Sequence, residues 1–244
     1  MQKQRWQRMK IFIDAGHNHS GCDTGAVGNG LREQDLTFQI AEALKPLLEG
    51  CGHEVKMSRN KITDSIGATQ AISIRERAVM ANSWGADLFI SIHCNAYNTL
   101  ARGTETLVYS KNGSAYPFAE RVQRAIVKAL GTVDRGVKER PDLGVLRRTS
   151  MPALLVETAF IDNMHDGTIL KNHIGDFAKA ICLGIVGDVC EDDTVLEEAA
   201  EMTKTLCEEF FPIDDPDGFS KALSAAKEKN SPLYWGYRKL LDRR

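Results

Sequence analysis

The sequence contains no long run of apolar residues. Its basic first segment, MQKQRWQRMK, is followed by only three of them, Ile11, Phe12 and Ile13, before Asp14. A secretory signal peptide needs about 7–15 consecutive apolar residues, and a transmembrane helix needs about 20. The sequence therefore predicts a protein that is made in the cytoplasm without a signal peptide and that has no stable membrane insertion.

The sequence also lacks a strong excess of charge and any CxxC cysteine pair. Its formal net charge of −2 gives no reason to expect nucleic-acid binding. Scattered cysteines in a chain of this size indicate buried apolar groups or free thiols rather than a disulfide framework. The six cysteines are Cys22, Cys51, Cys94, Cys182, Cys190 and Cys207.

Short apolar runs alternate with helical patterns between residues 10 and 190. KIFIDAG and DLFISIHCNA are typical of buried strands, and the spacing of Leu36, Ile40 and Leu44 is typical of a helix. This alternation favours an α/β fold, with a mostly parallel sheet flanked by helices on both faces. A capping box from Ser73 to Glu76 predicts the start of one helix. We expect strands at 10–16, 53–59, 87–96, 103–110, 144–148 and 152–160, and further helices at 35–50, 118–130 and 174–185.

Three reactive side chains stand at the ends of strand-like runs. His17 follows FIDAG, His93 ends FISIH, and Glu157 ends LLVE. Ligands of open parallel sheets bind beyond the carboxyl ends of the strands. We therefore expect these three side chains to lie along the same edge of the sheet.

Glu33 adds a fourth candidate at the opening of the first helix, where the helix dipole favours a carboxylate. A single-zinc hydrolase needs three His, Glu or Asp ligands and an open fourth position. Each residue alone also has a simpler interpretation: a hydrogen-bonded structural histidine, a dipole partner or a solvated glutamate. The pattern shows that the four residues are placed alike, and it leaves metal binding open.

A set of longer motifs carries a resemblance to a known family. They occur in the following order over about residues 10–190: IFIDAGHN, GAVGNGLREQDL, IRERAVMANSWGADLFISIHCNA, GTETLVYS, RGVKERPDLGVLRRTSMPALLVETAFIDN and ILKN. With them the chain resembles the zinc-dependent N-acetylmuramoyl-L-alanine amidases of the amidase-3 type, which are cell-wall hydrolases. The resemblance implies a twisted sheet of about six strands flanked by helices.

The resemblance also assigns roles to the four candidate residues. It implies one zinc ion per catalytic site, with His17 in AGHN, Glu33 in REQDL and His93 in SIHCNA as its ligands. It places the catalytic glutamate at Glu157 in LLVETAF, where the carboxylate would act first as a general base and then as a general acid.

The substrate that the resemblance implies is peptidoglycan. The bond is the amide between the lactyl group of N-acetylmuramic acid and L-alanine, and its hydrolysis would lyse the cell wall. Without a signal peptide, the enzyme would reach the wall after release, either through a holin or on lysis. Two alternatives stay open: a zinc amidohydrolase or peptidase that acts on soluble muropeptides, and a wall-binding protein without catalysis.

Three further residues are candidates for substrate binding or for supporting the ligands. Asn95 and Asn163 occupy positions typical of the family, and each has a structural turn role as its alternative. Arg147 follows GVL and would meet a carboxylate of the peptide stem, or else lie on a solvated edge.

The character of the sequence changes near residue 191. An acidic helical pattern is followed by the turn-rich stretch FPIDDPDG and by a basic end, LYWGYRKLLDRR. We therefore expect a zinc amidase catalytic domain at 9–190 and a helical C-terminal extension at 191–244. The extension would serve packing, cell-wall binding or oligomerisation, the last giving a homo-oligomer through its helices.

Overall fold

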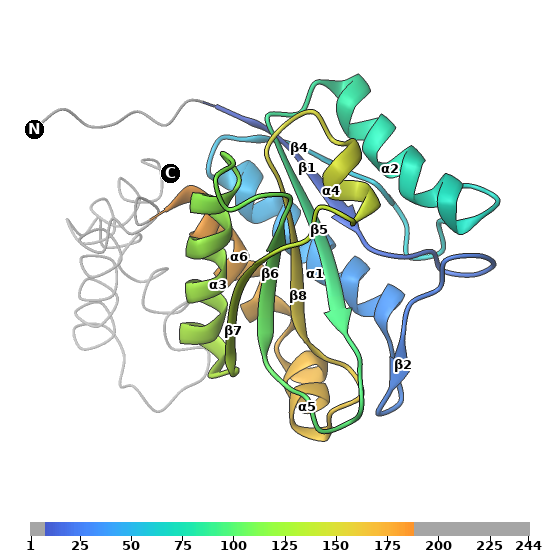
Figure 1. Ribbon diagram of the computed structural model, residues 1–244, viewed down its shortest axis with the longest axis vertical. Coiled ribbons are helices and arrows are strands. Elements are labelled where there is room, and N and C mark those ends of the chain that lie inside the picture. The colour runs from blue at the N-terminus through green and yellow to red at the C-terminus, as the bar shows by residue number, and fades with distance from the viewer. Residues whose placement is uncertain (1–7, 188–244) are drawn as a thin grey trace, which may run out of the picture. The chain divides into compact units, whose positions relative to one another are not determined.

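A sheet of six strands runs through the part of the chain that the structure describes, residues 8–187 of a computed structural model (Figure 1). Four neighbouring strands are parallel to one another, and the remaining two run antiparallel to them. The prediction of a mostly parallel α/β sheet of about six strands is confirmed. The order across the sheet is β4 (Glu54–Met57), β1 (Lys10–Ala15), β5 (Leu88–Asn95), β8 (Ala153–Phe160), β6 (Thr104–Val108) and β7 (Asp134–Glu139).

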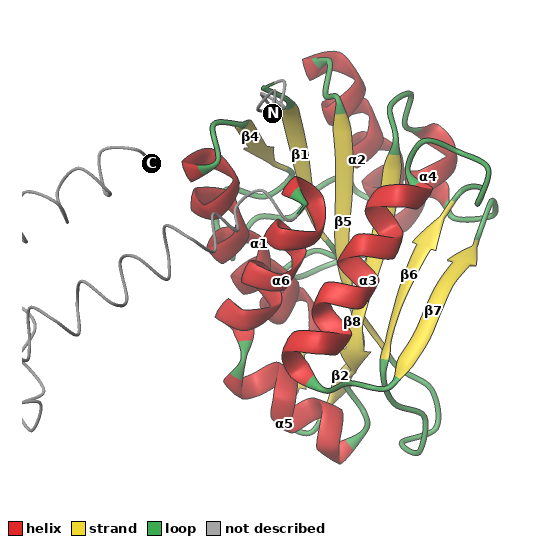
Figure 2. Ribbon diagram, turned by 90° about the vertical axis from the view of Figure 1, so that its left-hand side faces the viewer, coloured by secondary structure: helices red, strands yellow, loops and turns green. Residues whose placement is uncertain are grey.

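Helices cover both faces of this sheet. The first face carries α1 (Glu33–Gly50), α3 (Tyr116–Leu130) and α6 (Ile174–Val186), which lie in front of the strands in Figure 2. The second face carries α2 (Gln70–Trp84) and the short α4 (Gly144–Arg148). The remaining elements are α5 (Met164–Asn172), which follows β8, and a small hairpin of β2 (Val27–Gly28) and β3 (Leu31–Arg32). None of the helices within residues 8–187 has the length and apolar character that crossing a bilayer requires.

Alternation along the strands decides which side chains meet which helices. Ile13 and Ile90 are fully buried and belong to the core on the first face. Their neighbours Phe12 and Phe89 point to the second face, where their rings stack with centroids 5.9 Å apart. Trp84 of α2 covers Phe12 at a centroid distance of 6.4 Å. Every second residue counted from Phe89 along β5 therefore faces the α2 side of the sheet.

Two predicted elements were wrong in type or in start. Residues 144–148 were expected as a strand and form helix α4 instead. Val145 and Leu146 both pack on the second face, which a helical turn allows but an alternating strand does not. Helix α2 begins at Gln70, before the predicted capping box, because Thr69 caps it by accepting a hydrogen bond from the backbone N–H of Ile72.

A fully buried arginine on α2 ties the loop after β1 to the rest of the fold. The guanidinium of Arg77 donates to Asp14 Oδ1 at 2.6 Å and to the Ala15 carbonyl at 2.7 Å. It also donates to the carbonyl of His17 at 2.6 Å and to Asn18 Oδ1 at 3.0 Å. Four converging acceptor oxygens of this kind suit the planar fork of arginine and no other side chain.

Replacing Arg77 with methionine is expected to lower the free energy of unfolding by about 3–5 kcal/mol. The change removes one partner of a buried ion pair, so the Asp14 carboxylate stays buried without its countercharge. Urea denaturation followed by circular dichroism measures the loss. Arg75→Met is the matched control, since Arg75 lies exposed on the same helix, and its change should stay within about 0.5 kcal/mol. A loss below about 1 kcal/mol for Arg77→Met would contradict the structural role given to this pair.

Candidate metal centre

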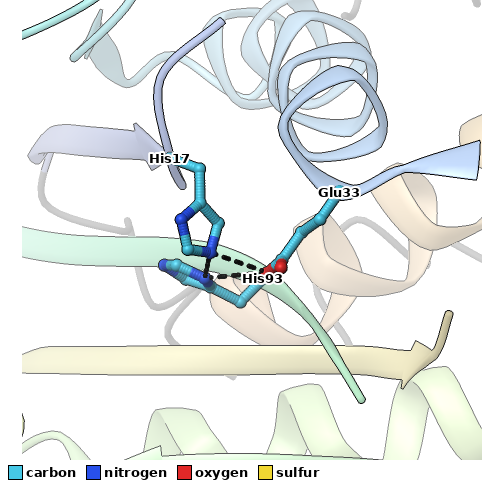
Figure 3. Close-up of side chains that lie close together, drawn as sticks. All are labelled: His17, Glu33 and His93. Carbon is cyan, nitrogen blue, oxygen red and sulfur yellow. Dashed lines mark hydrogen bonds and ion pairs between the residues drawn. The ribbon is translucent and has the colours of Figure 1, made fainter. Parts of the chain in front are cut away.

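Three side chains meet at the carboxyl ends of β1 and β5 (Figure 3). His17 Nε2 lies 3.1 Å from Glu33 Oε1 and 3.2 Å from His93 Nδ1. His93 Nδ1 lies 3.0 Å from the same Glu33 oxygen, so the three atoms form a nearly equilateral triangle. The structure thus brings together three of the residues that the sequence singled out, although they are far apart along the chain.

Each of the three side chains is placed by the element that carries it. His17 follows β1 with a backbone φ of 64°, in the left-handed region that residues other than glycine rarely adopt. Arg77 holds this conformation by its hydrogen bond to the His17 carbonyl. Glu33 is the first residue of α1. His93 lies on β5, and its side chain projects from the same face of the strand as that of Phe89. A strained backbone at a ligand position is a recurring feature of functional sites.

A second carboxylate orients the ring of His17. Asp23 Oδ1 lies 3.3 Å from His17 Nδ1, and the other Asp23 oxygen accepts a hydrogen bond from the Ser73 hydroxyl at 2.6 Å. With its proton on Nδ1, the imidazole turns the lone pair of Nε2 towards Glu33 and His93. This is the arrangement by which metal-bound histidines are commonly held. Asp14, which is also near in sequence, is instead engaged by Arg77 and by the Ser91 hydroxyl.

Backbone N–H groups orient the carboxylate of Glu33. Its Oε2 accepts from the N–H of Ala26 at 2.8 Å, and its Oε1 accepts from that of Cys94 at 2.9 Å. The loop backbone at position 25 lies so close to the side chains of Glu33 and His17 that this residue must be glycine. A Cβ atom on Gly25 would lie 2.6 Å from Glu33 Oε2 and 2.8 Å from the ring of His17. The cluster is therefore built into the backbone of the surrounding loops.

The cluster is electrostatically suited to a positive charge at its centre. Burial alone would lower the pKa of His17, but its hydrogen bonds with Asp23 and Glu33 raise that pKa to about 10. Burial alone would raise the pKa of Glu33, yet its hydrogen bonds with His17 and His93 hold that pKa well below the usual range. A proton shared between His17 and Glu33 balances the negative charge of the cluster, and a metal cation would do the same.

The dimensions and the donor types fit zinc. Zinc binds imidazole nitrogen and carboxylate oxygen at about 2.0–2.2 Å in tetrahedral geometry, which places neighbouring donor atoms about 3.3 Å from each other. The observed separations of 3.0–3.2 Å are close to this value. Two histidines and one glutamate form a donor set of catalytic zinc sites, which leave the fourth position open.

Glu157 lies beside this cluster on the neighbouring strand. It is paired in register with His93, and β8 continues beyond it to Phe160, within the strand predicted at 152–160. Its Oε2 is buried and has no hydrogen-bond partner among residues 8–187. Burial raises the pKa of Glu157 to about 7, with the charges of Glu33 and Glu105 adding to the effect and that of His93 opposing it. A carboxyl group of this kind can both take up and release a proton near neutral pH.

The three supporting candidates lie in different places. Asn95 ends β5 two residues beyond His93, on the same face of the strand, and its Oδ1 accepts from the N–H of Ala96. Asn163 caps α5, with its Oδ1 accepting from two backbone N–H groups. Arg147 is exposed on α4 and borders a hollow of 290 Å³ that none of the four site residues lines. A role for Asn95, Asn163 or Arg147 towards substrate stays a prediction, and the helix cap is the structural role that the sequence left open for Asn163.

Sequence reasoning did not place the residues that hold the site. Asp23 and Asp14 are both near His17 in the sequence, and the sequence alone does not tell which of them meets the ring. Arg77 was missed, and it lies in a helix whose other charged residues, Arg75 and Glu76, are more exposed. One signal for Arg77 was available: it shares a helix face with Ser73, Ala78 and Ala81, and all four residues are buried. A charged residue on an otherwise small and buried face indicates an internal partner.

Comparison with known proteins gives one family. Residues 11–186 match the family model Amidase_3, described as N-acetylmuramoyl-L-alanine amidase. The chain is similar to the N-acetylmuramoyl-L-alanine amidase CwlM of Bacillus licheniformis, with 37% identity over 80% of this chain and 73% of that protein. It is also similar to an endolysin of Bacillus phage SPP1, with 36% identity over 72% of this chain and 64% of that protein.

The fold is similar to that of a solved member of this group. The crystal structure of an N-acetylmuramoyl-L-alanine amidase from Clostridium difficile 630 matches with a TM-score of 0.66 and 31% sequence identity. The match covers 77% of this chain and 100% of that chain.

Proposed function

The chain belongs to the N-acetylmuramoyl-L-alanine amidase family, and from this premise we propose that His17, Glu33 and His93 bind a catalytic zinc ion beside Glu157. The protein is a hydrolase of peptidoglycan that cleaves the amide between N-acetylmuramic acid and L-alanine. The observation that carries the metal assignment is the triangle of donor atoms at 3.0–3.2 Å, supported by Asp23 and by two backbone N–H groups.

The proposed chemistry divides between the metal and Glu157. A zinc ion held by two imidazoles and a carboxylate supplies a Lewis acid, which polarises the scissile carbonyl and makes an attacking water more acidic. Glu157 takes the proton of that water and delivers it to the nitrogen of the leaving L-alanine. A pKa near 7 suits both steps, because the carboxyl exchanges its proton readily near neutral pH.

Two alternatives make different demands on the same site. A purely structural metal in a wall-binding protein would need no base, and the buried, unpartnered Oε2 of Glu157 favours catalysis over this alternative. A zinc peptidase or amidohydrolase of soluble muropeptides would use the same residues. It differs from the proposal in leaving intact sacculi uncleaved.

The domain boundaries and the route to the wall are also proposals. The match over residues 11–186 supports a catalytic domain at 9–190. The extension at 191–244, and the oligomer predicted through its helices, lie outside the described residues and stay predictions. Similarity to a phage endolysin supports action on the wall. Release through a holin or on lysis stays a prediction.

Digestion of purified sacculi tests the proposed function. We expect new N-terminal L-alanine and free glycan strands, measured by mass spectrometry. Both products should disappear after treatment with a chelator and return on addition of zinc. Cleavage of soluble muropeptides alone would favour the muropeptide enzyme, and binding to sacculi without any cleavage would favour the non-catalytic wall-binding protein.

A further inference from the structure

A second charged cluster lies directly beside Glu157. Glu105 of β6 is the antiparallel partner of Glu157 in the sheet, so the two side chains project from the same face. The Cβ atoms of residues that face each other in this way are about 4.5–5.5 Å apart. Side chains that pair with the Glu105 carboxylate therefore lie close to the proposed catalytic base, Glu157.

Two cations of the edge strand β7 hold the carboxylate of Glu105. Arg135 Nε donates to Glu105 Oε2 at 2.7 Å, and Lys138 Nζ donates to the same oxygen. The side chain of Glu105 is only 10% exposed, whereas those of Arg135 and Lys138 are 33% and 42% exposed. The carboxylate thus lies beneath two cations that face solvent, and one of the two positive charges is not balanced by it.

The guanidinium of Arg135 is fixed by a second contact. Its central carbon lies 4.9 Å from the ring centre of Phe160, whose strand partner in register is Asn95. Among residues 8–187, the two terminal nitrogens of Arg135 have no hydrogen-bond partner. The Arg135 guanidinium is thus planar, fixed in position and able to donate from both terminal nitrogens, which suits it to binding a carboxylate.

The next cation along the chain behaves differently. Arg140 forms a two-pronged pair with Asp142, with distances of 2.9 Å from Nε and 2.8 Å from Nη2. Its charge is therefore neutralised within the pair. The unbalanced positive charge beside Glu157 belongs to Arg135 and Lys138.

The peptide stem of the substrate carries an anion near the scissile bond. The second residue of the peptide stem bears a free carboxylate unless that carboxylate is amidated. A peptide extends by at most about 3.6 Å per residue, so this group lies at most about 7 Å from the scissile amide. Resting on the proposed amidase function, we propose that Arg135 and Lys138 bind the carboxylate of the second stem residue and make the enzyme select unamidated stems.

A structural interpretation of the same cations makes a different prediction. Lysine and arginine on an edge strand also protect the sheet from pairing with another chain. In that role, the two cations would not affect whether the enzyme prefers an acid or an amide at the second stem residue. The ratio of activities on two matched substrates separates the interpretations, because any effect on the catalytic step cancels in the ratio.

The test uses soluble disaccharide peptides whose second stem residue is either D-isoglutamate or D-isoglutamine. We expect kcat/KM of the unaltered protein to be about tenfold higher for the acid than for the amide, the range of a charge-assisted hydrogen bond. Arg135→Gln and Lys138→Gln should each bring this ratio close to one, mainly by raising KM for the acid. Lys138→Arg should keep the ratio, since it keeps the charge.

Lys179→Gln is the matched control, because Lys179 is an exposed lysine on α6, which covers the other face of the sheet. Its ratio should equal that of the unaltered protein. Equal hydrolysis of acid and amide by the unaltered protein would overturn the inference and leave the amidase function intact. Full selectivity in both glutamine variants would also overturn the inference. Hydrolysis of neither soluble substrate, together with uncleaved sacculi, would overturn the amidase function and this inference together.

Discussion

Replacing Glu157 with glutamine is expected to lower kcat by about 10²- to 10⁴-fold, the range that a positioned acid–base group contributes. Glutamine keeps the shape of the side chain and removes its ability to accept and return a proton. The metal ligands are three other side chains, so zinc content should equal that of the unaltered protein. Single-turnover kinetics on a soluble muropeptide, together with metal analysis of the same preparation, measures both quantities.

Glu42→Gln provides the control for this substitution. Glu42 is exposed on α1, and its replacement should change neither kcat nor zinc content. Unchanged turnover in Glu157→Gln would refute the role of Glu157 as the base. Loss of zinc from that variant would indicate that Glu157 acts as a ligand instead.

The pH dependence gives a separate measure of the same group. A general base acts in its deprotonated form, so kcat/KM should rise with pH through the pKa of Glu157. Burial raises this pKa to about 7, and a cation bound nearby lowers it, so the acidic limb should have its midpoint at or below about pH 7. In Glu157→Gln, the residual activity should lack this limb.

Replacing His93 with alanine is expected to abolish stable zinc binding and, with it, hydrolysis of sacculi. A catalytic zinc site has three protein ligands, and the change leaves only His17 and Glu33. Loss of a group that merely orients a ligand already weakens metal binding about 10- to 100-fold, so loss of a ligand should weaken it by at least about 100-fold. Zinc content after dialysis, measured by mass spectrometry, should fall from one ion per chain to near zero.

Thermal unfolding gives a readout that is independent of activity. A ligand at about 100 times its dissociation constant stabilises the folded state by about 2.7 kcal/mol. For a chain of this size that corresponds to a rise in Tm of about 5–10 °C. The unaltered protein and the control His165→Ala should show this rise on addition of zinc, because His165 is exposed on α5 and outside the cluster. His93→Ala should show none, and an equal rise in that variant would exclude His93 as a ligand.

The positions of the site residues along the chain were predictable because they follow local rules. An apolar run that ends in a polar side chain predicts a strand that presents this side chain at its end, and β1 and β5 behave in this way for His17 and His93. The first turn of a helix favours a carboxylate, and Glu33 is the first residue of α1. Longer motifs then identified the family, which the match over residues 11–186 shows.

Local rules failed where the pattern was polar or the segment short. β7 has the sequence DRGVKE and no apolar alternation, because it is an edge strand whose side chains contact Glu105 and solvent. The segment 144–148 is apolar enough for a strand, but it joins β7 to β8 and turns as helix α4 over the second face. In both cases the deciding contacts come from parts of the chain that are distant in sequence.

The sequence by itself determined the alternating α/β architecture, the family and the four residues that the proposed mechanism uses, since periodicity and motif order are local properties. The tertiary structure alone decided what surrounds them: Asp23 against His17, Arg77 beneath the loop after β1, and Glu105 opposite Glu157. The reason is physical. A buried polar or charged group needs a partner, and where the partner lies depends on the folding of distant segments against one another.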